Sequence, residues 1–150
     1  MVNYSNKEHR KVLVYTNPED GYPPEEWESI WTEVMSNGRL RVDNIPFYAK
    51  DLSLGDIIET KEKDGAFYLD NTVELSSNST VRIIIFKLEM EDRIRKELIR
   101  SGCSIEGVGI DGLIAVNIPL AATPGVMDYL SREAEAESID FEEGSLRLAS

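Results

Sequence analysis

The order of predicted elements in the second half of the chain constrains its fold more than any other feature. Residues 81–86 (VRIIIF) have the apolar, β-branched composition of a buried strand. The next stretch places Met90, Ile94 and Leu98 on one face of a helix, which Gly102 ends. A strand followed at once by an amphipathic helix predicts a layered sheet rather than a helical bundle.

Two more strands and a second helix follow. Residues 104–109 and 113–118 flank Asp111-Gly112, a dipeptide typical of two-residue hairpin turns. Thr123 is expected to be the N-cap of a helix that continues to about Glu137, because proline follows it at the first helical position.

The chain then returns to extended structure over residues 139–141 and 146–148. The complete order from residue 81 is β-α-β-β-α-β. This is the order of the ferredoxin-like fold, in which an antiparallel sheet carries two helices on one face.

The first half is predicted to be mainly β. Short apolar runs between residues 11 and 75 are separated by turn signals such as Asn37-Gly38 and Asp64-Gly65. The predicted class is therefore α+β. A small antiparallel β-barrel-like part over 1–79 precedes a ferredoxin-like part over 80–150, and a single compact unit containing both remains an alternative.

Residues 27–35 (WESIWTEVM) fit two structures. Trp27, Ile30 and Val34 have helical spacing, which favours a helix ending near Gly38. The Asn-Gly dipeptide and the alternating residues 39–42 instead favour a hairpin. We interpret the segment as a strand entering that hairpin.

The charge limits the classes of partner. The chain has 28 acidic and 16 basic side chains, a formal net charge of -12 and a pI of about 4.5. Such a field repels phosphate backbones and anionic lipids, so no nucleic-acid or membrane partner is expected, and a basic protein partner is favoured. The N-terminal residues lack the apolar run of a secretory signal, and we expect a cytoplasmic protein.

No residue pattern predicts catalysis or metal binding. The one histidine, His9, lies beside cationic residues, and the one cysteine, Cys103, follows a predicted helix end whose dipole would raise its thiol pKa. Asp56 and Glu59 belong to a group of carboxylates without a motif that fixes their separation. We therefore expect no enzyme activity, no cofactor and no metal site.

Arg82 is unusual because it interrupts an apolar strand. The interpretation we favour is an outward-facing arginine that meets a surface carboxylate. The alternative is a buried structural ion pair.

Two segments have features of a protein-binding surface. The first combines Tyr22, Glu25, Glu26 and Trp27, because aromatic side chains are enriched at interface hot spots. Alternatively, Trp27 and Trp31 cover the core and the acids only solvate a loop.

The second segment is the acidic C-terminal third, where four glutamates are candidates for electrostatic steering of a partner. These are Glu133, Glu137, Glu142 and Glu143. A solvated acidic surface without a partner is the alternative.

Together these features predict an acidic protein-binding inhibitor, most simply an immunity protein that neutralises a cognate antibacterial toxin by occluding its active site. Acidic clusters accelerate encounter with a basic partner, while aromatic anchors slow its release. The alternatives are a non-catalytic ligand-binding or regulatory module, and a small carboxylate-dependent enzyme.

Three motifs resemble an uncharacterised bacterial domain-of-unknown-function family. They are R-V-D-N-I-P-F-Y-A at 41–49, S-L-G-D-I-I at 53–58 and S-S-N-S-T-V-R at 76–82, and the resemblance covers about residues 27–120. It implies a shared fold with a strand around Trp31, but no activity. In the family pattern Gly-His often stands where this chain has Ser77-Asn78, which argues against enzyme activity here.

Overall fold

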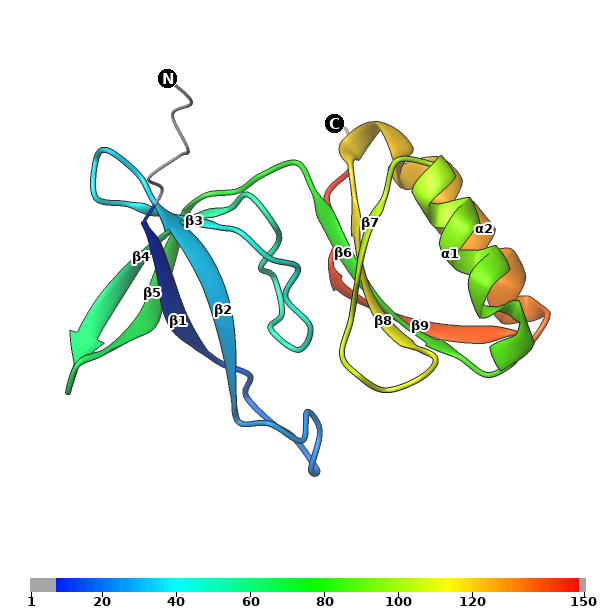
Figure 1. The fold of residues 1–150 in the computed structure, drawn as a ribbon, viewed down its shortest axis with the longest axis horizontal. Coiled ribbons are helices and arrows are strands. Elements are labelled where there is room, and N and C mark those ends of the chain that lie inside the picture. The colour runs from blue at the N-terminus through cyan, green and yellow to red at the C-terminus, as the bar shows by residue number, and fades with distance from the viewer. Residues whose placement is uncertain (1–7, 149–150) are drawn as a thin grey trace, which may run out of the picture.

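The computed structural model describes residues 8–148, which form a β-barrel joined to a helix-covered sheet (Figure 1). This mixed α+β architecture agrees with the predicted class. The barrel contains five strands, β1 to β5. Their bounds are His9–Tyr15, Trp27–Val34, Leu40–Val42, Ile57–Lys63 and Ala66–Glu74.

The barrel closes through a parallel contact between β1 and β5, where Leu13 lies opposite Tyr68. All its other neighbours are antiparallel. This one pair departs from the predicted antiparallel, barrel-like arrangement. Five strands that alternate in direction leave the first and last running the same way, so closing them requires one parallel pair.

Strand β2 confirms the hairpin interpretation of residues 27–35. Ile30 and Thr32 are fully buried while Trp27 and Trp31 are exposed, which is the period of a strand with one buried face. The turn differs from the predicted one, because only Gly38 has a positive φ and Asn37 instead accepts a hydrogen bond from the Arg39 N–H.

The second part comprises β6 (Ser79–Ile85), α1 (Glu91–Arg100), β7 (Ser104–Gly107), β8 (Leu113–Ile118), α2 (Thr123–Glu135) and β9 (Ile139–Ser145). The strands form one antiparallel sheet in the order β7-β8-β6-β9. Both helices lie on the same side of it (Figure 1). Their buried residues, including Ile94, Leu98 and Leu130, pack with alternate residues of the strands.

The ends of α2 differ from the predicted ones. Ala122 is the N-cap, and the Thr123 hydroxyl donates to the Pro119 carbonyl because a short 3-10 turn (Leu120–Ala122) precedes the helix. The helix stops at Glu135, and Glu137 adopts a positive φ. A left-handed residue just past a helix end terminates it even when it is not glycine.

The long loop between β3 and β4 extends from the barrel toward the sheet in Figure 1 and makes contacts between the two parts. Ile45 and Phe47 of this loop pack on Ala115 of β8. The Asp51 N–H donates to the Gly144 carbonyl at 2.8 Å. The loop therefore covers part of the sheet face that the helices leave open.

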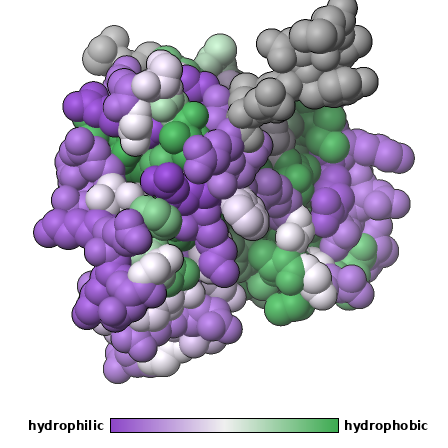
Figure 2. All heavy atoms as spheres, turned by 60° about the vertical axis from the view of Figure 1, so that its left-hand side comes forward, coloured by the Kyte–Doolittle hydropathy of each residue, from purple (hydrophilic) through white to green (hydrophobic). Residues whose placement is uncertain are grey.

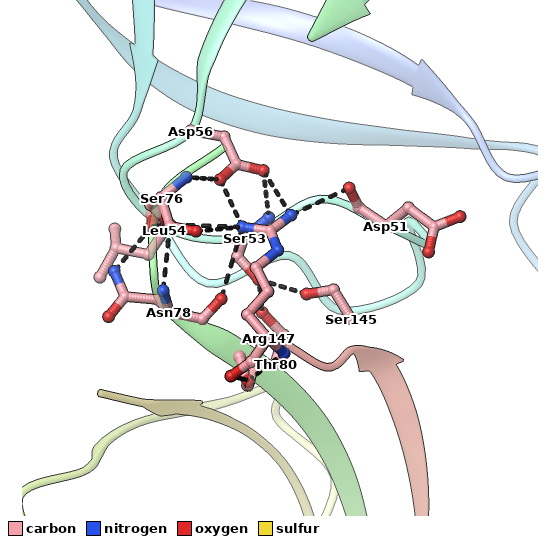
Figure 3. A network of polar contacts seen from close by, with 10 residues as sticks. Asp51, Ser53, Leu54, Asp56, Ser76, Asn78, Thr80, Ser145 and Arg147 are labelled. Atoms are coloured by element: carbon pink, nitrogen blue, oxygen red, sulfur yellow. Dashed lines mark hydrogen bonds and ion pairs between the residues drawn. The ribbon is translucent and has the colours of Figure 1, made fainter. Parts of the chain in front are cut away.

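A buried polar network fixes the same junction (Figure 3). Asp56, with no exposed surface, receives two bonds from the Arg147 guanidinium at 2.6 and 2.9 Å and two more from the N–H groups of Ser53 and Ser76. The Ser53 hydroxyl also bonds those of Thr80 and Ser145. These contacts connect the loop, the linker after β5 and the C-terminal segment.

Candidate functional site

A pocket of about 400 Å³ lies between the open face of the sheet and two loops of the barrel part. Strands β6, β8 and β9 form the sheet side of the pocket, and the β1–β2 and β3–β4 loops form the opposite wall. The lining residues are Tyr22, Phe47, Tyr48, Arg82, Ile84, Leu113, Asp140, Phe141 and Glu142.

The alternation of β6 turns Arg82 toward this pocket. Val81 and Ile83 belong to the helix-covered core, so Arg82 and Ile84 lie on the opposite face of the strand. Only 4% of Arg82 is exposed. The favoured prediction of a solvent-facing arginine was therefore wrong, because the β3–β4 loop covers this position.

The Arg82 guanidinium is incompletely bonded. Its Nη2 donates to the Ala49 carbonyl at 2.6 Å, while Nη1 lies 3.7 Å from a carboxylate oxygen of Glu142. This contact confirms the alternative of a buried arginine with a carboxylate partner. Nevertheless, Nε and Nη1 have no hydrogen-bond acceptor in the described structure.

Gly144 provides the space in which the guanidinium lies. A Cβ atom at this position would stand 2.9 Å from both Nη1 and Nη2 of Arg82. Any larger residue would push the arginine away from Ala49. The glycine therefore helps to set the orientation of the unbonded N–H groups.

Glu142 connects Arg82 to the rim of the pocket. It lies directly opposite Arg82 in the β6–β9 pairing and accepts a hydrogen bond from the Tyr22 hydroxyl at 3.1 Å. Burial raises the pKa of Tyr22, and the charge of Glu142 raises it further. Tyr22 therefore stays protonated and keeps donating at neutral pH.

Aromatic rings form the wall that the two loops contribute. The rings of Tyr22 and Tyr48 meet edge to face at 6.2 Å, and those of Phe47 and Tyr48 at 4.7 Å. The Glu28 carboxylate holds this loop by accepting the N–H groups of residues 47, 48 and 49 at 2.6 to 2.9 Å. Charge-assisted hydrogen bonds to Glu28 thus fix the backbone that carries the Phe47 and Tyr48 rings.

The predicted partner-binding residues near the N-terminus are all exposed. Tyr22 is 48% and Trp27 44% exposed, and Glu25 and Glu26 lie on the surface between them. The Trp27 ring contacts the Tyr15 ring at a tilt and the Tyr68 ring edge to face, at centroid distances of 5.2 and 5.3 Å. The alternative in which Trp27 and Trp31 cover the core was therefore wrong, since Trp31 is also 53% exposed.

The structure brings together only part of the two predicted surfaces. Tyr22 and Glu142, which are 120 positions apart, are in contact. Glu133 instead pairs with Arg93, and Glu137 lies in the turn after α2. Glu143 lies opposite Val81 in the strand pairing, on the other face of β9 from Glu142. The four glutamates do not form one surface.

Figure 2 shows a mixed surface on the face of the molecule that it draws. Hydrophilic side chains predominate there, and hydrophobic ones gather in small patches between them. This distribution accords with the acidic composition, and it makes the pocket at the junction a more specific feature than the outer surface.

The other candidate groups have structural partners. Asp56 is engaged by Arg147, while the exposed Glu59 lies 3.9 Å from Arg39, so these two carboxylates do not form an acid–base pair. His9 contacts Asp43 at the surface. Burial raises the pKa of Cys103 to about 11, so its thiol stays protonated at neutral pH. The direction agrees with the prediction, but burial rather than the helix end is the cause.

A closed five-stranded barrel, joined by a covering loop to a helix-backed antiparallel sheet, defines a two-part α+β protein with a pocket at the junction. A model of the family described as "Domain of unknown function (DUF4265)" matches residues 28–141, so the chain belongs to that family. The predicted resemblance to a family of unknown function is thereby confirmed.

The fold is similar to that of a solved structure. It is titled "Novel crystal structure of a hypothetical protein from Neisseria gonorrhoeae" and is 20% identical, with a TM-score of 0.75 over 95% of this chain and 97% of that chain. Among curated proteins, no sequence matches this chain. Within residues 8–148, no helix is long and apolar enough to cross a bilayer.

Proposed function

We propose that this protein is a ligand-binding module whose pocket takes a small organic carboxylate. The observation that carries the proposal is Arg82, a nearly fully buried residue that lines the pocket and has two buried nitrogen atoms, Nε and Nη1, without a hydrogen-bond acceptor in the described structure. Buried charged groups in proteins are normally paired and hydrogen-bonded, because desolvation otherwise costs several kcal/mol.

A carboxylate supplies what Arg82 lacks. Its two oxygens match the planar fork of a guanidinium, and such pairs are stronger than neutral hydrogen bonds. The aromatic and aliphatic lining suits an apolar body on the same molecule, and the volume falls within the usual range of ligand sites.

We further propose that the sheet and helices of the second part are ferredoxin-like. The β-α-β-β-α-β order, the strand order β7-β8-β6-β9 and two helices on one face support this description. The ligand would then bind on the helix-free face, where the barrel part provides the second wall.

Binding of 3-phenylpropionate tests the proposed carboxylate site. We expect saturable binding by calorimetry, and an affinity at least about tenfold lower in Arg82→Met, since a charge-assisted pair is lost. Arg41→Met is the matched control, because Arg41 is an exposed strand arginine of β3 that does not line the pocket. The affinity of Arg41→Met for 3-phenylpropionate should equal that of the native protein.

Amide chemical shifts of the native protein provide an independent readout if Arg82→Met is poorly folded. Titration with 3-phenylpropionate should move the resonances of Ile84, Leu113 and Phe141. Undiminished binding in folded Arg82→Met, shifts confined to other regions, or no saturable binding at millimolar ligand would overturn the proposal.

A second candidate function is inhibition of a basic protein, as an immunity protein inhibits its toxin. The exposed segment that contains Tyr22, Glu25, Glu26 and Trp27 favours it, because rigid aromatic groups and acids occur together on one surface loop. Such a partner would be recognised by its positive charge and bound in the cytoplasm.

Charge reversal tests this second function. Affinity purification at low salt, followed by a high-salt wash, should yield one basic, salt-sensitive partner. With that partner, Glu25→Lys/Glu26→Lys should slow association by roughly tenfold. Glu62→Lys/Asp64→Lys is the control, since it changes the net charge equally at exposed positions of the β4–β5 hairpin. Equal association rates for both double variants would contradict an interface at Glu25 and Glu26.

A further inference from the structure

We infer that the ligand of the pocket is zwitterionic: an α-amino acid with an apolar side chain, its carboxylate on Arg82 and its ammonium group between Glu142 and Asp140. This inference rests on the proposed function and narrows it. It follows from the arrangement of charges around the pocket, which a simple carboxylate leaves unbalanced.

The pocket contains more negative than positive charge. Arg82 is the one cation among its lining residues, whereas Asp140 and Glu142 are both carboxylates. A monoanionic ligand would increase this excess in a partly desolvated site, where like charges repel strongly. A zwitterion adds no net charge and places an opposite charge at each end of the site.

The strand geometry places the two acids on one side of the arginine. Glu142 pairs with Arg82 and Asp140 pairs with Ile84, so the acids are two residues apart on the same face of β9. One Asp140 oxygen accepts the N–H of Phe141, and Asp140 has no ion pair within residues 8–148. Its charge is available to an incoming cation.

The position of the Glu142 carboxylate would let it replace Arg82 with a ligand cation while Tyr22 still holds it. Its carboxylate lies 3.7 Å from Arg82 Nη1, beyond hydrogen-bond distance, while Tyr22 bonds its other oxygen at 3.1 Å. A ligand carboxylate on Nη1 and Nε would take over the pairing of the guanidinium. The ligand ammonium, one carbon away from that carboxylate, would then replace Arg82 as the cation beside Glu142.

The remaining surface of the pocket defines the side chain of the ligand. Ile84 and Leu113 form an apolar floor, and the rings of Phe47 and Tyr48 stand against it. An aliphatic or aromatic side chain buries apolar surface there. A charged side chain would find no partner among these four residues.

Three probes of similar shape test the inference on the full chain. They are L-phenylalanine, 3-phenylpropionate without the ammonium group, and phenethylamine without the carboxylate. We expect phenylalanine to bind about tenfold or more tightly than either of the others, since each loses one charge-assisted interaction. Equal affinities for phenylalanine and 3-phenylpropionate would overturn the zwitterion inference while leaving the carboxylate site intact.

The double variant Asp140→Asn/Glu142→Gln separates the two proposals further. Both substitutions keep an oxygen acceptor, so Tyr22 retains a partner, but Glu142→Gln removes the negative charge beside the buried Arg82. Circular dichroism therefore establishes that the variant is folded before its binding is measured. Phenylalanine affinity should fall about tenfold, whereas 3-phenylpropionate affinity should hold or rise because the repulsion is removed. A parallel fall for both probes would contradict the inference, and phenylalanine binding that is undiminished in folded Arg82→Met would contradict the proposed function as well.

Discussion

Replacing Asp56 by alanine should lower the free energy of unfolding by about 3–5 kcal/mol, the usual cost of breaking a buried ion pair by removing one partner. Asp56 is fully buried and accepts bonds from Arg147, Ser53 and Ser76. Alanine leaves the guanidinium of Arg147, itself largely buried, without its carboxylate. Denaturant unfolding followed by circular dichroism measures the difference.

A surface ion pair provides the control for this prediction. Asp70 lies 3.3 Å from Lys61 on the outside of the barrel, where both side chains are exposed. Asp70→Ala should cost no more than about 1 kcal/mol, because water screens the pair. The account of Asp56 as the center of the junction would be wrong if both variants had similar stability.

Replacing Gly112 by alanine should cost about 3 kcal/mol. Gly112 has a φ of +79°, and an added Cβ would stand 2.8 Å from both the Ile85 carbonyl oxygen and the Leu88 side chain. The first contribution is the strain of a left-handed conformation, about 1 kcal/mol, and the second is overpacking against backbone, which costs about 1–3 kcal/mol. Thermal unfolding at neutral pH measures the loss.

Gly109→Ala measures the first contribution alone, so the difference between the two variants gives the second. It lies in the same β7–β8 connection with a φ of +80°, but an added Cβ would meet nothing within 4 Å. Gly109→Ala should therefore cost only about 1 kcal/mol, the conformational strain alone. Comparable losses for the two variants would show that close packing against Ile85 is unimportant.

Hydrophobic periodicity predicted most of the elements because it reports on burial. The alternation in β2 and the helical spacing of Met90, Ile94 and Leu98 both correspond to faces that the structure buries or packs against the core. Turn dipeptides were less reliable. Asp64-Gly65 has the two positive φ angles expected of a type I′ turn, whereas Asn37-Gly38 and Asp111-Gly112 have only one each.

The pocket was beyond prediction from local patterns, although its main residue carried a signal. An arginine inside an apolar strand is unusual, and that feature could have directed attention to Arg82. Nothing nearby in the chain indicates that the loop after β3 would cover it, or that Glu142 and Tyr22 would meet there. These contacts join segments 33 to 120 positions apart.

By itself, the sequence determined the α+β class, most of the strand and helix positions and the acidic charge, because these depend on residue type and short-range spacing. Tertiary structure decided the parallel closure of the barrel, the partner of Asp56 and the burial of Arg82. Each of these depends on which distant segments pack together. Packing between the two halves encloses the arginine beside a pocket, and that enclosure, rather than any motif, makes it a candidate for binding a ligand.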